Sequence, residues 1–334
     1  MIKTAPVLLI IVLALSLQSC FKKDEMVTPH PRGDVKTDTI PMTENYLHQV
    51  YFSLDSGKIV STNVKTTFDL GFECSETGWR VILNTSDFVR VADLGDVPFG
   101  QAYDTTGLKM RFDKSDGNPD SNAIGQWYKI SGNDTISNNH VYALSRGLDE
   151  LGNPLGLCQV IFDSLKNNTY YFRYAPLKGG SGTAGTVAKN ADVNYLFFSL
   201  KTGTVLPVEP SRQRYDLLFS QYTTLLYTDQ GIPYPYLVTG VLLNRFQVQM
   251  VVDSTVDFTA ITRELAISKV YSGVLDGIGY DWKFYSFSSG VYTIRPKVNY
   301  IVKSVSGFYF KLRFVAFYNK DGLKGYPVIE YQML

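Results

Sequence analysis

The sequence predicts an all-β protein made of two related antiparallel units, and three observations lead to this prediction. The chain of 334 residues contains 23 Tyr and 20 Phe but only 3 Trp, and aromatic and β-branched residues are enriched in β-strands. Short runs of such residues alternate with turn-forming pairs such as Asp116-Gly117 and Ser306-Gly307. In addition, a set of sequence landmarks occurs twice in the same order.

The expected strands are the β-branched or aromatic runs between these turns. They comprise residues 50–54, 80–83, 170–174, 238–243, 246–252, 300–302 and 308–318. Helical spacing is found at residues 255–267, where Phe258, Ile261 and Leu265 share one face. This stretch predicts one short helix in an otherwise β chain.

The repeated landmarks have a structural interpretation. The paired segments are 51–57 (YFSLDSG) and 197–203 (FFSLKTG), 68–72 (FDLGF) and 215–219 (YDLLF), strands ending at Asn84 and Asn244, and 127–129 (WYK) and 282–284 (WKF). Gly57 and Gly203 supply the positive φ of a turn. We expect Asp69 and Asp216 to accept hydrogen bonds from a turn or a neighbouring strand rather than to act in catalysis.

Composition divides the chain into a leader, a tether and two β units. We expect a signal peptide over residues 1–19, a flexible tether over 20–45, a first β unit over 46–177, a linker over 178–189 and a second β unit over 190–334. The tether is rich in Thr, Pro and Asp, and the linker is rich in Gly. Both units have the usual size of a domain. One continuous sandwich built from two halves is the alternative.

The first twenty residues resemble a lipoprotein export signal. Lys3 is followed by the apolar residues 6–17, a stretch that is short for a membrane span and suits a signal peptide. Residues 17–20 (LQSC) are typical of the site at which lipoprotein signal peptidase cuts before an acylated cysteine.

Two or three acyl chains, such as palmitate, hold a protein on its membrane. We therefore expect a lipoprotein anchored through Cys20 in the outer membrane of a Gram-negative envelope. The charged residues 21–25 favour display on the cell surface. An ordinary secretory signal or a short membrane anchor is the alternative.

Other compositional features argue against several functions. The net charge of +1 gives no basis for binding nucleic acid. With 3 His, the sequence offers no catalytic constellation and no metal-binding spacing. The Asp-rich residues 113–120 lack the closing Glu of an EF-hand and are interpreted as a surface turn. Cys74 and Cys158 either form a disulfide or remain buried thiols. We expect a protein that binds without catalysing a reaction and holds no metal.

The ordered landmarks resemble the HmuY-like haem-binding lipoproteins, a family with an all-β fold. The segments of the second copy that match the family pattern are residues 198–203, 215–219, Asn244, Trp282, 300–303, Gly307, 311–314 and Gly325. The resemblance covers nearly all of residues 190–334, and in the first copy it is good from Tyr51 to Asn84. It implies an envelope protein that binds haem or a related porphyrin, with an outer-membrane uptake complex as a candidate partner.

The chain departs from the family where haem iron is held. Well-studied members hold the iron with two histidines or two methionines. The corresponding positions fall near Asn118 and around Ser131 or Phe287, and none of these is a histidine. The remaining candidates for haem ligands are Met110, His140 and Met250.

Tyrosines around residues 233–235 (PYP) offer a second kind of binding site. The candidate cluster consists of Tyr222, Tyr227, Tyr234 and Tyr236. Exposed aromatic rings stack on sugars or porphyrins and contact protein partners, whereas buried ones pack over a sheet edge. Two functions follow from the sequence. The first is haem or porphyrin binding at a divergent site. The second is a structural or accessory surface lipoprotein that binds a glycan or a protein and no haem.

Overall fold

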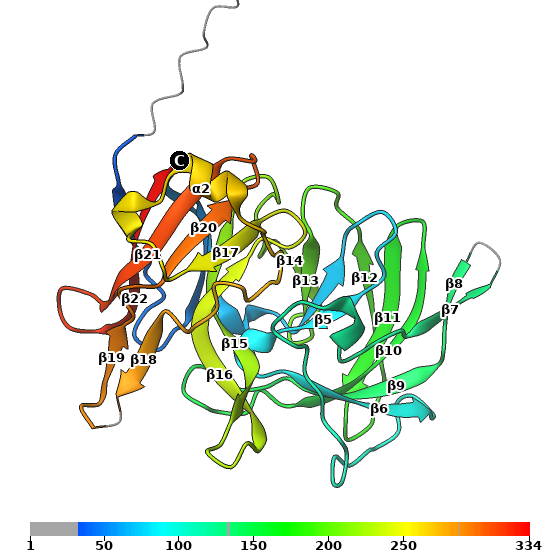
Figure 1. Cartoon of the computed structure of the whole chain (residues 1–334). Helices are drawn as coiled ribbons and strands as arrows, with labels where there is room; N and C mark the ends of the chain where they lie inside the picture. Colours follow the sequence, from blue (N-terminus) through cyan, green and yellow to red (C-terminus); the bar gives the residue numbers. More distant parts are fainter. Residues whose placement is uncertain (1–32, 132–133, 287) are drawn as a thin grey trace, which may run out of the picture. The chain divides into compact units, whose positions relative to one another are not determined.

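The structure is a computed structural model that describes residues 33–131, 134–286 and 288–334 (Figure 1). Residues 34–334 form one compact unit. The all-β prediction is confirmed, because the described residues form mostly antiparallel strands and one six-residue α-helix, α2 (Arg263–Ser268). The expected helix over 255–267 is interrupted at Ile261, whose extended backbone separates the 3-10 turn Phe258–Ala260 from α2.

Two hydrophobic cores divide the chain into parts that we call half A and half B. Core A is formed by residues between Leu70 and Leu200. Core B is formed by residues from 40–54 together with residues from 217–331. Half A is therefore one continuous stretch, residues 68–206, whereas half B combines residues 34–64 with residues 215–334.

Half A contains two sheets. Its strands are β4 (Leu70–Glu73), β5 (Val81–Leu83), β6 (Arg90–Asp96), β7 (Tyr128–Ser131), β8 (Asp134–Ser137), β9 (His140–Ser145), β10 (Leu157–Lys166), β11 (Thr169–Pro176), β12 (Thr183–Ala188), β13 (Tyr195–Ser199) and β14 (Thr204–Leu206). The larger sheet has the order β12-β11-β10-β9-β6, and β10 also pairs with the β7–β8 hairpin. The smaller sheet has the order β14-β13-β4-β5.

Half B repeats this arrangement. Its strands are β1 (Lys36–Thr39), β2 (His48–Ser53), β3 (Lys58–Val64), β15 (Leu217–Tyr227), β16 (Pro233–Leu243), β17 (Gln249–Asp253), β18 (Lys283–Ser286), β19 (Val291–Ile294), β20 (Asn299–Lys303), β21 (Tyr309–Tyr318) and β22 (Lys324–Met333). One sheet has the order β1-β22-β21-β20-β17, another has the order β16-β15-β2-β3, and β18 pairs with β19.

The two copies of the repeat exchange their first strands. In β2, Phe52 of the first copy lies opposite Leu217 of the second, and in β13, Phe198 of the second copy lies opposite Leu70 of the first. Each half therefore takes its Phe-Ser-Leu strand from one copy and its Asp-containing strand from the other. The halves also meet through a smaller cluster of buried residues. That cluster comprises Tyr51, Phe68, Tyr195, Phe197, Val208 and Tyr215.

The repeated aspartates hold these exchanged strands in place. Asp216 Oδ2 accepts a hydrogen bond from the Leu54 N–H at 2.7 Å, and Asp69 Oδ2 accepts one from the Leu200 N–H at 2.7 Å. Both aspartates are buried, and burial raises the pKa of Asp216 to about 6. The structural role expected of these residues is confirmed. Asp69 differs in that Arg146 Nε also lies 2.8 Å from its Oδ1.

The Gly-rich segment 178–189 contains an edge strand rather than a linker throughout. Residues Thr183–Ala188 form β12, which pairs antiparallel with β11. Gly185 lies against the Phe172 ring, where a Cβ atom would clash. The small residues here therefore allow β12 to lie close to the core. From composition alone, the same residues predict a flexible linker.

Two remaining predictions concern cysteines and the Asp-rich turn. Cys74 and Cys158 are both free and buried, so the disulfide does not form, and burial raises the pKa of Cys158 to about 12. In the Asp-rich segment, Asp113 is buried and accepts hydrogen bonds from the N–H groups of Leu83 and Ala123, each at 2.7 Å. Asp113 therefore fastens the loop to half A.

Candidate functional site: a tyrosine cleft

A cavity of about 1000 Å³ opens in half B. Its walls come from the β15–β16 hairpin, the β18–β19 hairpin and the turn between β21 and β22. Seven tyrosines line it: Tyr46, Tyr234, Tyr236, Tyr280, Tyr285, Tyr292 and Tyr318. We call this cavity the tyrosine cleft.

Two hairpins, β15–β16 and β18–β19, position four of these side chains, Tyr234, Tyr236, Tyr285 and Tyr292. Both project beyond the sheets of half B (Figure 1). The β2 strand pairs only with residues 217–219 of β15, so the outer part of the β15–β16 hairpin has no further neighbouring strand. Residues 224–227 and 233–237 of this outer part are exposed or half-buried, whereas Tyr222 and Thr223 are buried. Across the second hairpin, Tyr285 lies opposite Tyr292, with ring centroids 5.0 Å apart.

A buried lysine borders the cleft. Lys283 Nζ donates to the Thr239 carbonyl at 2.5 Å and lies 4.1 Å from the centroid of the Trp282 ring. Burial lowers the pKa of Lys283 to about 7. Trp282 belongs to core B, where its ring stacks on Phe314 at 3.9 Å. Arg295 and Lys324 add two exposed cations to the lining.

Burial acts on the titration of two cleft tyrosines, Tyr46 and Tyr292. Burial raises the pKa of Tyr46 and of Tyr292 above the usual value, and neighbouring tyrosines raise both further. Neutral aromatic rings suit the stacking of a planar ligand. Within the described residues, no cluster of three or more His, Cys, Asp or Glu is placed to hold a metal ion.

The predicted tyrosine cluster is divided by the structure. Tyr234 and Tyr236 line the cleft, with their ring centroids 6.2 Å apart. Tyr222 is buried against Val238 and Leu275, and burial raises its pKa. Tyr227 is exposed near the tip of the hairpin and does not line the cleft. The prediction therefore identified two cleft residues and missed those contributed by more distant segments.

The candidate haem ligands are not brought together. Met250 is buried in core B, paired with Val302, and is inaccessible to a ligand. His140 lies in half A, where its Nδ1 is 2.9 Å from Asp93 Oδ2. Met110 is a half-buried loop residue of half A. None of the three lines the tyrosine cleft.

The positions carried over from the family contain no iron ligand either. Asn118 caps the 3-10 helix Pro119–Ser121, because its side chain accepts from the Asp120 N–H at 3.0 Å. Ser131 is the last residue of β7, and Phe287 lies outside the described residues, as does Cys20.

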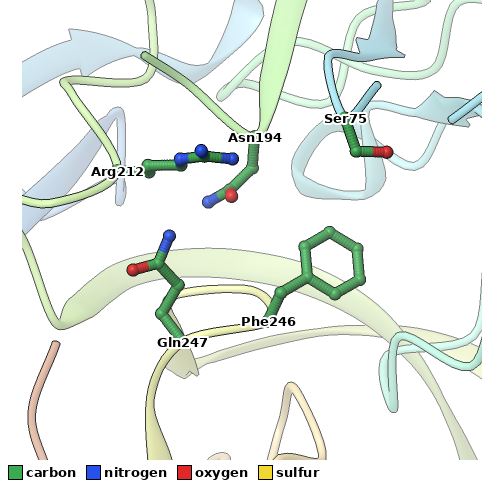
Figure 2. Close-up of a pocket in the computed structure, with 5 residues that line it drawn as sticks. All are labelled: Ser75, Asn194, Arg212, Phe246 and Gln247. Atoms are coloured by element: carbon green, nitrogen blue, oxygen red, sulfur yellow. The ribbon is translucent and has the colours of Figure 1, made fainter. Parts of the chain in front are cut away.

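A second cavity, of about 380 Å³, lies where the two halves meet. Figure 2 shows Arg212, Asn194 and Ser75 along one side and Gln247 and Phe246 along the other. We call it the junction pocket. Sequence reasoning missed it, although Arg212 precedes Asp216 by the same spacing that separates Lys65 from Asp69.

Comparison with known proteins places the chain among its relatives. The family model described as HmuY protein matches residues 45–331. The chain belongs to the HmuY protein family. None of the curated proteins matches it. Among the described residues, no helix is long and apolar enough to span a membrane.

Similar solved structures include three related proteins. Apo PinO from Porphyromonas gingivitis is 12% identical and covers 90% of this chain and 98% of its own, with a TM-score of 0.31. The apo HmuY analog TFO from Tannerella forsythia is 11% identical and covers 91% and 98%, with a TM-score of 0.26. A putative HmuY-like heme binding protein from Bacteroides vulgatus is 19% identical and covers 41% and 82%, with a TM-score of 0.18.

Proposed function

We propose that this HmuY family member is a non-enzymatic binding lipoprotein of the bacterial envelope, and that its ligand is a planar ring compound of the haem and porphyrin class. The observation that carries the proposal is the cavity of about 1000 Å³ lined by seven tyrosines. The proposal includes attachment to the outer membrane through Cys20, display on the cell surface and delivery to an uptake complex. Protease treatment of intact cells tests the display, because a surface protein is digested and a periplasmic one is protected.

The chemistry of the cleft suits such a ligand. Ligand pockets of roughly 300–1,000 Å³ bury most of a molecule of this size and are lined mainly by aromatic and apolar groups. Aromatic rings contribute stacking, and the exposed cations Arg295 and Lys324 are available to the carboxylates that porphyrins carry at their edge.

The side chains of the cleft do not fit axial coordination by a histidine or methionine pair. His140 and Met110 belong to half A, and Met250 is buried in core B. Burial raises the pKa of Tyr46 and Tyr292, which disfavours the deprotonated form in which a phenol binds iron. We therefore propose that stacking and carboxylate contacts hold the ring, and that the iron contributes little.

Titration with two related ligands tests this proposal. The chain from Met26 onward, which includes the whole compact unit, is titrated with haemin and with metal-free protoporphyrin IX, and the absorbance is followed. Saturable binding of both, with dissociation constants within about threefold, is expected. Tyr236→Ala and Tyr292→Ala should each weaken binding about tenfold, since stacking and burial of one ring contribute roughly 1–2 kcal/mol. Tyr227→Ala is the matched control, on the same hairpin but outside the cleft.

Two results would contradict the proposal. Absence of saturable binding of either compound would remove the porphyrin class. Sharp low-spin bands that require His140 or Met110 would restore iron coordination and overturn stacking as the mode of binding.

One observation favours the alternative, a structural or accessory surface lipoprotein that binds a glycan or a protein. The tip of the β15–β16 hairpin exposes 64% of Tyr227 and 61% of Ile232. Exposed aromatic and aliphatic side chains of this kind contact partners. On this alternative, Tyr227→Ser weakens binding to a glycan or protein, and porphyrins do not bind at all.

A further inference from the structure

The two copies of the repeat place a cation at equivalent positions. Lys65 and Arg212 each precede the repeated aspartate by four residues. Asn84 Nδ2 donates to the Lys65 carbonyl at 2.7 Å, and Asn244 Nδ2 donates to the Arg212 carbonyl at 2.7 Å. The same backbone framework therefore holds both cations.

The residues that face these cations are also equivalent. Asp87 and Gln247 each lie three residues after the repeated asparagine. The Asp87 N–H donates to the Asn84 carbonyl at 3.4 Å, and the Gln247 N–H donates to the Asn244 carbonyl at 3.5 Å. Counted from the repeated asparagine, Gln247 has the turn position of Asp87, although the loop of the second copy is one residue shorter, since the Val89 and Val248 N–H groups both donate to the asparagine carbonyl at 3.2 Å.

In the first copy, a carboxylate and an amide from the chain itself surround the cation. Lys65 Nζ lies 3.6 Å from Asp87 Oδ1 and donates to Gln221 Oε1 at 2.7 Å. The side chains of Lys65 and Asp87 are 2% and 1% exposed. A buried cation is stable when a carboxylate and hydrogen bonds surround it in this way.

In the second copy the same place is the junction pocket. Arg212 makes no ion pair with any residue that the structure describes, and the space beside it has a volume of about 380 Å³. The Arg212 guanidinium and the Gln247 amide border one space (Figure 2). Gln247 carries an amide and no charge, so Arg212 can pair with an anion from outside the chain.

The neighbouring acids are engaged elsewhere. Glu209 accepts hydrogen bonds from Asn194 Nδ2 at 2.8 Å and from the Tyr215 hydroxyl at 2.6 Å. Glu73 pairs with Arg80 at 3.2 Å and accepts from the Ser75 hydroxyl at 2.7 Å. Neither acid therefore neutralises the guanidinium.

Phe246 adds an exposed ring to the rim of the pocket. It is 68% exposed and has a φ of 67°, a left-handed conformation that is strained for a bulky residue. Phe88 in the corresponding loop of the first copy also has a positive φ, of 64°, so this conformation belongs to the repeated loop. Its ring lies beside the space that Arg212 and Gln247 border (Figure 2).

We propose that the junction pocket binds a small carboxylate attached to a ring. The ligand carboxylate takes the place that the Asp87 carboxylate holds in the first copy, where Arg212 pairs with it and the Gln247 amide donates to it. The ring of the ligand packs against Phe246. Planar guanidinium groups bind carboxylates through two parallel hydrogen bonds, which suits this arrangement. This site is separate from the tyrosine cleft.

Calorimetric titration of the chain from Met26 onward with sodium benzoate tests the proposal. Saturable binding is expected, and benzamide, which has the same shape without the charge, should bind at least tenfold more weakly. Arg212→Met should weaken benzoate binding at least tenfold, whereas Arg214→Met, an exposed neighbour, should leave it unchanged. Phe246→Ala should weaken benzoate binding severalfold and leave acetate binding unaffected.

Gln247→Asp provides a second test that does not rely on loss of a residue. The new carboxylate recreates the ion pair of the first copy, so benzoate affinity should fall at least tenfold while Tm rises and porphyrin binding is unchanged. The proposal is overturned if benzoate does not bind saturably, or if it binds the Arg212→Met and Gln247→Asp variants as tightly as the original chain.

Discussion

Halves A and B share a scaffold but differ in what they add to it. The five-strand orders β12-β11-β10-β9-β6 and β1-β22-β21-β20-β17 correspond strand for strand. The strands β4 and β5 have four and three residues, whereas their counterparts β15 and β16 have eleven each. The extra length forms the hairpin that walls the tyrosine cleft. The repeat therefore accounts for the cores, and the longer β15–β16 hairpin of half B adds one wall of the tyrosine cleft.

The largest effect is expected from removing the first three strands. A chain that begins at Lys65 lacks β1, β2 and β3, and so lacks Phe52 and Leu54 of core B. Half A contains all of its own strands and keeps its core. Hydrogen exchange should show protection retained in β10 and β11 and lost in β20 and β21. Equal loss in both halves would show that they fold only as one cooperative unit.

Replacing the two repeated tryptophans compares the cores directly. Trp127→Ala and Trp282→Ala should each destabilise the protein by about 3–5 kcal/mol, because both remove a large buried ring. Only Trp282→Ala should also weaken porphyrin binding, since Lys283 rests on that ring at the edge of the cleft. Urea denaturation and the porphyrin titration measure the two effects. Equal loss of porphyrin binding in both variants would contradict the placement of the site in half B.

A pH dependence is expected from the buried lysine of half B. Lys283 has a pKa of about 7 in the folded chain, below its usual value of 10.5. Between these values the unfolded chain holds a proton that the folded chain lacks, so the free energy of unfolding rises with pH by at most about 1.4 kcal/mol per unit. Urea denaturation at pH 6.5, 8 and 9.5 should show this rise and its loss in Lys283→Met. If the Lys283→Met variant showed the same rise as the original chain, the pH dependence would come from other titratable groups.

The smallest effect distinguishes the two aspartates. Asp216→Asn should cost about 1–2 kcal/mol, because the amide places a donor against the N–H of Leu54 or Val305. Asp69→Asn should cost more, because it also removes the partner of Arg146. Thermal unfolding of both variants measures the difference. A smaller loss for Asp69→Asn would show that the ion pair does not stabilise half A.

The fold class and its landmarks were predictable because they depend on local chemistry. Aromatic alternation identifies strands, and an aspartate between apolar neighbours needs backbone donors, as Asp69 and Asp216 both find. The exchange of strands was not predictable. Residues 51–54 and 197–200 are nearly identical, so nothing local specifies which copy each one pairs with.

The candidate site was only partly predictable, because burial depends on distant segments. Tyr222 and Tyr234 belong to the same aromatic hairpin, yet Leu275 helps to cover the first and leaves the second in the cleft. The junction pocket brings together Ser75, Asn194 and Gln247, which lie far apart in the sequence. Its Arg212 is recognised as unpaired among the described residues only when the structure shows which side chains surround it.

The strand exchange also determines the order in which the chain can be completed. Residues 34–64 are synthesised early, yet Leu54 bonds to Asp216, 162 residues later, and β1 pairs with β22 near the end of the chain. Closing so long a loop is slow. Half A can assemble before β1 and β2 have met their partner strands. Until β1 and β2 dock, β22 and β15 present open sheet edges. At high concentration we expect those edges to accept the same strands from another molecule, which would give a strand-exchanged dimer.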